Sequence, residues 1–156
     1  MNQKRVVREG IGFGMIAGVI FGAAELVAAA GAGTPIRMAA SVVLGREALG
    51  SSVGTTFLAG IVVHLVMSAV LGLVYVELDA RLPAYEQVRY WRQLGLGLVF
   101  GALVWLIGFE VVAPWLYPWF LTGHPAAQLV FHALFFGAPL GLMMAASERK
   151  IPATAQ

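Results

Sequence analysis

Two glutamates and two histidines stand inside apolar stretches of this chain, where ionisable side chains are rare. Glu25 and Glu110 occupy two of these stretches, and His64 and His132 occupy the other two. Gln128 precedes His132 by one helical turn and would share its helix face. Carboxylates and imidazoles are groups that proteins use for proton transfer and metal binding. These five residues are therefore the candidate functional residues.

Three interpretations of this polar cluster are open. In the first, each glutamate pairs with a histidine and the pairs only hold the helices in register. In the second, His64 and His132 ligate a haem, or join the glutamates around a divalent metal ion. In the third, the cluster belongs to a proton or ion pathway. Each requires the side chains to point into the bundle, and Arg37 is the expected partner at its outer rim.

The elements that would carry these residues are four apolar segments, at residues 11–30, 55–76, 94–113 and 127–146. A membrane-spanning helix needs about 20 mostly apolar residues. The chain is 60% hydrophobic and only 12% charged, whereas soluble domains have about 25% charged residues. We therefore expect an all-α membrane protein, one domain over residues 1–156 with four transmembrane helices. Pro139 predicts a distortion of the fourth helix.

The first apolar segment has a second interpretation, as a cleaved signal peptide, because basic residues precede it and small residues follow it. Its length and the glutamate inside it favour a retained transmembrane helix. The loop that follows contains Thr34 and Pro35, which can start a helix, and Gly45, which can end one. This segment is too short to span a bilayer, so it predicts a short interfacial helix.

The basic residues indicate the orientation in the membrane, because cytoplasmic loops are enriched in lysine and arginine. One side has eight of them and the other side has two, Arg37 and Arg46. This bias places both termini in the cytoplasm of a multi-pass protein of the cell (inner or plasma) membrane. The eight on the inner side are Lys4, Arg5, Arg8, Arg81, Arg89, Arg92, Arg149 and Lys150.

Aligning the two halves of the chain indicates an internal repeat, about 10–81 and about 95–149. Glu25 then aligns with Glu110, and His64 aligns with His132. The triplet beginning at Leu71 recurs at Leu140, one residue out of register with the histidines. We expect two copies of a helical hairpin, related by an axis near the membrane normal.

Small residues recur at four-residue spacing, which lets helix backbones approach closely in lipid. The stripe on the first segment predicts packing within the bundle, or docking of another subunit or a second copy. The glycines expected to pack helices are Gly14, Gly18, Gly22, Gly72, Gly137 and Gly141.

The sequence lacks cysteine and has no recognisable nucleophile, phosphate-binding or dinucleotide-binding motif. Its net charge of +2 gives no sign of nucleic-acid binding. We therefore expect a non-enzymatic subunit or scaffold of a membrane complex, such as a respiratory or transport complex. The alternatives are a haem- or metal-binding membrane protein that uses His64 and His132, and a small proton-coupled carrier or channel.

Overall fold

The computed structural model describes residues 3–31, 33–83, 89–122 and 124–149, and the long elements in this part of the chain are helices. Four of them are long and apolar enough to cross a membrane, as predicted. Two are continuous, α1 (Gln3–Ala28) and α3 (Val53–Asp79). The other two each combine three segments: α5 (Tyr90–Trp105), η2 (Leu106–Val112) and α6 (Ala113–Leu116), then α7 (Pro125–Phe131), η4 (His132–Gly137) and α8 (Ala138–Glu148).

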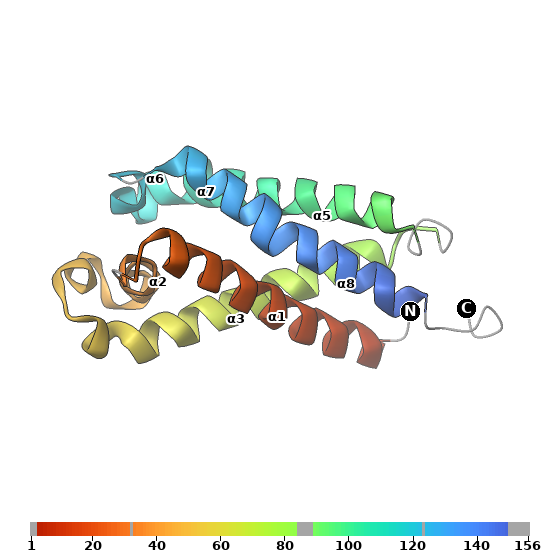
Figure 1. Ribbon diagram of the computed structural model, residues 1–156, viewed down its shortest axis with the longest axis horizontal. Coiled ribbons are helices and arrows are strands. Elements are labelled where there is room, and N and C mark those ends of the chain that lie inside the picture. The colour runs from red at the N-terminus through yellow and green to blue at the C-terminus, as the bar shows by residue number, and fades with distance from the viewer. Residues whose placement is uncertain (1–2, 32, 84–88, 123, 150–156) are drawn as a thin grey trace.

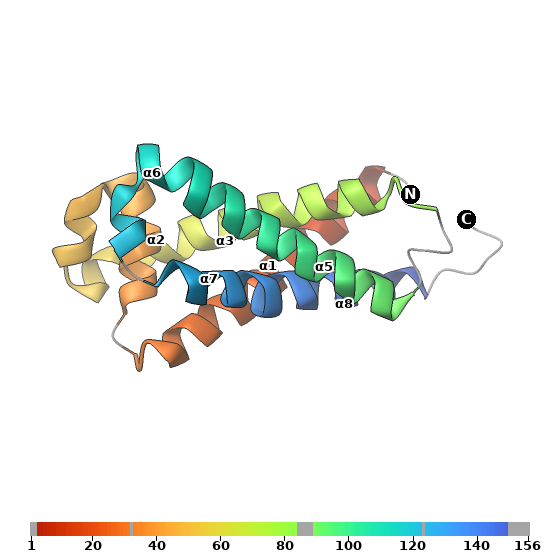
Figure 2. The ribbon, with the colours of Figure 1, turned by 90° about the horizontal axis from the view of Figure 1, so that it is seen from above.

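The long helices form two pairs, and consecutive helices are neighbours in each pair. The α1 helix packs on α3, and α5 packs on η4 and α8. Figures 1 and 2 show the start of α1 and the end of α8 at one end of the molecule, with α2 and α6 at the other. The basic residues in the first turns of α1, Lys4, Arg5 and Arg8, therefore lie at the same end as Arg149, which follows α8.

The two helices of the second pair each contain a π-helical segment, η2 and η4. Each segment ends two residues before a proline, Pro114 or Pro139. Proline has no backbone N–H, and its ring collides with the carbonyl four residues earlier, so the preceding turn must widen. The distortion predicted at Pro139 is thus a π turn, and η2 repeats it at Pro114.

Glycines at the crossing points let the paired helices touch backbone to backbone. A Cβ on Gly14 would overlap the carbonyl oxygen of Ser68 and lie 2.9 Å from the Cα of Gly72. A Cβ on Gly97 would overlap the carbonyl oxygen of Gly137 and lie 3.2 Å from the Cα of Gly141. Because close backbone approach maximises van der Waals packing in lipid, these glycines determine how each pair crosses.

The core lies where the two pairs meet. Phe21 on α1 packs with Phe136, Leu140 and Met144 from η4 and α8, and Tyr75 of α3 joins the same cluster. Aromatic rings and branched side chains fill this space because the glycine crossings bring the backbones close elsewhere. The core therefore connects the pairs, while the glycines hold each pair together.

The predicted short helix is α2 (Thr34–Leu44), which packs against α3. Gly33 precedes it in the left-handed region, with φ of 68°, and Gly45 ends it with φ of 79°. Two short 3₁₀ turns complete this end of the molecule, η1 (Arg46–Gly50) and η3 (Pro118–Thr122). The indole N–H of Trp119 in η3 donates to the Ser41 hydroxyl at 2.9 Å, so α2 is tied to the second pair.

Candidate functional site

His64 of α3 is directed at the backbone of α1. Its Nε2 lies 2.8 Å from the carbonyl oxygen of Gly18. The approach is possible because Gly18 and Gly22 have no side chains to block the ring. Phe21 stacks on the imidazole, with ring centroids 5.5 Å apart and planes 8° from parallel. His64 is half-buried, and its ring joins α1 to α3.

His132 starts the π segment η4 and bonds within its own helix. Its Nδ1 lies 2.8 Å from the carbonyl oxygen of Gln128. The edge of the same Phe21 ring meets His132, with centroids 4.7 Å apart, and Phe109 contacts it at 5.9 Å. One phenyl ring thus touches both imidazoles, and each imidazole uses one nitrogen on a backbone carbonyl.

Glu25 of α1 and Gln128 of α7 form a polar contact between the two pairs. The Gln128 amide Nε2 donates to Glu25 Oε1 at 2.8 Å, and both residues are half-buried. The structure thus brings together two residues of the predicted polar cluster. The contact of Arg37 with Glu25 stays a prediction; Arg37 is half-buried on α2.

Glu110 does not join this cluster. It lies in η2 and is exposed, among apolar residues that are also exposed. The prediction that all four ionisable residues point into the bundle is therefore wrong for Glu110. The reason is the crossing geometry: Gly97 and Gly101 face α8 and η4, and that leaves Glu110 on a different side of the helix.

Comparisons of the chain with protein-family models, with characterised proteins and with solved structures find no match.

The histidine pair does not fit a haem or a shared metal ion. Phe21 contacts both imidazoles from between α1 and η4, where a porphyrin held by the two histidines would have to lie. Among the described residues, no three His, Asp or Glu side chains are grouped closely enough to hold a metal ion. The haem interpretation therefore does not fit this arrangement.

Sequence reasoning missed a second polar network at the opposite end, between α1 and α8. Arg5 Nη2 lies 2.9 Å from Glu148 Oε1, and Arg5 Nε donates to Glu9 Oε1 at 2.9 Å. The Ser147 hydroxyl donates to the same Glu9 oxygen at 2.6 Å. Glu9 and Glu148 are buried, at 7% and 3% exposure.

The same network has a counterpart between α3 and α5. The Tyr75 hydroxyl donates to Gln93 Oε1 at 2.7 Å, and the Gln93 amide donates to Asp79. All three side chains are buried. The sequence does contain a signal for both networks, because the acidic residues Glu9, Asp79 and Glu148 flank three of the predicted spans.

Removing the amide of Gln128 should weaken the contact between the pairs. We expect Gln128→Leu to lower the free energy of unfolding by about 1–3 kcal/mol, because the half-buried Glu25 carboxylate loses its hydrogen-bond donor. SDS-induced unfolding followed by circular dichroism measures this. Replacing both residues, Glu25→Leu with Gln128→Leu, should restore part of the loss, since no polar group then lacks a partner. Equal stability of wild type and Gln128→Leu would contradict the structural role.

Proposed function

We propose that this protein is a non-enzymatic subunit of a membrane assembly, and that it meets its partner through the face of α5 and η2 that carries Glu110. The observation behind this proposal is an exposed carboxylate within a candidate membrane span, Tyr90–Leu116. Its apolar neighbours, 45% to 57% exposed, are Leu103, Leu106, Ile107 and Val111.

The free-energy cost of such a carboxylate supports a covered surface. A charged side chain at the centre of a membrane helix costs about 2.5–3.5 kcal/mol on insertion scales, and Glu110, nearer the end of its span Tyr90–Leu116, costs less than this. Such residues therefore normally face protein or water and have a partner. A transmembrane helix with a hydrogen-bond donor or a cation at the same depth would supply that partner. The chemistry of this face favours a heteromeric contact, because two copies would place like charges together.

The glycine face of α1 is not available for this contact. Gly10, Gly14, Gly18 and Gly22 face Leu73, Ser68 and His64 of α3. A second subunit on that stripe would have to displace α3. This stripe therefore packs α1 against α3, and the Glu110 face is the surface left for a partner.

The proposal also includes an internal repeat of two helical hairpins and the orientation of the chain in the membrane. Gly14 and Gly97 meet equivalent groups in their two pairs, which supports a repeat. The one-residue slip between the histidines and the Leu-Gly-Leu triplets falls where η4 adds a residue to its turn. These contacts, however, align Gly14 with Gly97. In that alignment Glu25 does not fall on Glu110, so the two glutamates are not counterparts. The basic end would face the cytoplasm, and α2 would lie at the outer surface.

A carrier or channel is less well supported by the described residues. Between the Glu25–Gln128 contact at one end and the network around Arg5 at the other lie buried apolar side chains. They are Phe21, Phe136, Leu140 and Met144. A proton or ion would have to cross this layer without polar groups from these residues. This apolar layer favours a subunit of a membrane assembly over a carrier or channel.

Photo-cross-linking in intact membranes tests the proposal. A photoreactive residue at Ile107 should give a discrete protein adduct, whereas one at Val66 on α3 should react with lipid only. The two positions are matched, since both are 55% exposed. Glu110→Leu should weaken the adduct about tenfold or more, because a paired carboxylate is lost. Equal yields of protein adduct at the two positions, or an adduct yield unchanged by Glu110→Leu, would overturn the proposed interface.

A further inference from the structure

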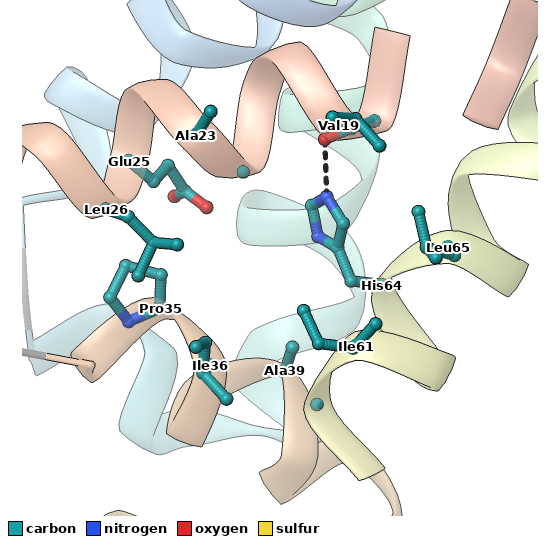
Figure 3. A pocket seen from close by; sticks show the side chains of 13 residues that line it. Val19, Ala23, Glu25, Leu26, Pro35, Ile36, Ala39, Ile61, His64 and Leu65 are labelled. Atoms are coloured by element: carbon teal, nitrogen blue, oxygen red, sulfur yellow. Dashed lines mark hydrogen bonds between the residues drawn. The ribbon is translucent and has the colours of Figure 1, made fainter. Parts of the chain in front are cut away.

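A second feature, independent of the Glu110 face, is a cavity of about 250 Å³ between α1, α2 and α3. Its walls are apolar except for two groups, the Glu25 carboxylate and the His64 imidazole. Figure 3 shows both side chains directed into it, with Pro35, Ile36 and Ala39 of α2 on the opposite side. Convergent polar groups in an apolar cavity are typical of a small-molecule site.

The cavity is held open by the packing around it. A Cβ on Gly60 would overlap the carbonyl oxygen of Ile36, so this glycine lets α2 lie directly on α3. Trp119 bonds to Ser41 on α2 and keeps that helix in place from the second pair. These two contacts hold α2 against α3 and η3, at a distance from Glu25 that leaves the cavity open.

The cavity is also accessible from the lipid side. Val19, one of its lining residues, is 59% exposed, and Ala23 beside it is exposed. In a membrane-spanning helix such surfaces face acyl chains. A lipid-soluble molecule could therefore enter from the bilayer without crossing the bundle.

The hydrogen bonds already made identify which groups remain for a ligand. A carbonyl oxygen only accepts, so His64 Nε2 must donate its proton to Gly18. In the neutral imidazole the other nitrogen, Nδ1, is then an acceptor, and it lies on the Glu25 side of the ring (Figure 3). Glu25 accepts from Gln128 through Oε1, and an ionised carboxylate has only acceptors to offer.

A matching ligand must therefore donate hydrogen bonds, and a positive charge would balance the carboxylate. A primary ammonium does both, with three donors on one small cation. The volume limits the apolar part. Since a 150 Å³ cavity holds benzene, one of this size holds roughly ten non-hydrogen atoms. A phospholipid with its headgroup is too large.

We propose that the cavity binds a small lipophilic primary amine, with its ammonium group between Glu25 and His64 and its apolar chain among α1, α2 and α3. The amine enters from the bilayer through the opening beside Val19. Binding neutralises the carboxylate, while Gln128 continues to orient it.

Equilibrium dialysis of labelled n-octylamine against the full-length protein in phosphatidylcholine nanodiscs tests this. Phosphatidylcholine has no primary amine, and empty nanodiscs give the partitioning background. We expect saturable binding with one amine per chain, and binding at least about tenfold weaker for n-octanol and octanoate, because neither can give the carboxylate a charged donor. Equal or tighter binding of octanoate or octanol would overturn the ligand class.

Two variants locate the site. Ala39→Phe fills the cavity without touching its polar groups, and Glu25→Gln removes the charge while keeping a polar side chain. Each should reduce octylamine binding at least about tenfold, whereas Glu110→Gln, on the exposed face, should leave it unchanged. If the folded Ala39→Phe variant binds octylamine as well as wild type does, the proposed site is wrong. This outcome does not depend on whether Glu25→Gln folds. A failed cross-linking experiment at Ile107 would not affect this result, because the cavity and the Glu110 face are separate sites.

Discussion

Gly14→Leu is expected to separate α1 from α3 and to lower the free energy of unfolding by about 3 kcal/mol or more, at the upper end of overpacking costs. The new Cβ would overlap the Ser68 carbonyl oxygen and press on the Cα of Gly72. Both are backbone atoms, so no side-chain rotation can relieve the clash. The helices must move apart, and the packing along the whole crossing is lost.

Gly12→Leu is the matched control, since it lies two residues away on the same helix. A Cβ on Gly12 meets nothing within 4 Å. Leucine also favours a helix over glycine by about 1 kcal/mol or less, so this variant should be as stable as wild type or slightly more stable. Gly97→Leu and Gly95→Leu form the same comparison on α5, where a Cβ on Gly95 also meets open space. SDS-induced unfolding measures all four variants, and equal losses within either comparison would refute the crossings.

Arg5→Leu is expected to destabilise the end of the molecule where the termini meet by about 3 kcal/mol. The guanidinium is bonded to both Glu9 and Glu148, and both carboxylates are buried. Removing one partner of a buried ion pair leaves a charge without compensation, which costs more than the pair itself contributes. We place the effect at the lower limit of the usual range because the Arg5 side chain is 18% exposed.

The double variant Arg5→Leu with Glu148→Gln should recover part of this loss, because one buried charge is removed with its partner. Arg5→Lys should lie between wild type and Arg5→Leu, since one ammonium cannot reproduce the forked contacts of a guanidinium. Arg81→Leu is the control: its bond to Glu77 is exposed, at 67% and 47%, so the change should stay within about 0.5 kcal/mol. Thermal unfolding in detergent measures the series, and equal effects of Arg5→Leu and Arg81→Leu would contradict a buried network.

Much of the architecture follows from local properties of the chain. Each of the four long helices could be recognised because its apolar run is long enough to span a bilayer, and this depends only on consecutive residues. The α2 helix was recognisable for a similar reason, from Pro35 near its start and Gly45 at its end.

The partners of the polar residues could not be predicted in the same way. Glu25 meets Gln128 of a distant helix, and Arg5 meets Glu148 at the other end of the chain. Those contacts depend on the rotation and crossing of packed helices, which are determined by the backbone contacts at Gly14 and Gly97. The alignment of Glu25 with Glu110 compared residue types and ignored these crossings, so it placed Glu110 in the interior.

The sequence by itself determined which four segments are long and apolar enough to cross a membrane, because hydropathy and length depend only on consecutive residues. Only the tertiary structure decided that Glu25 and His64 share a cavity while Glu110 faces outward. A side chain's surroundings depend on which helix lies against it and at what angle, and the close glycine contacts that determine this join residues far apart in the chain.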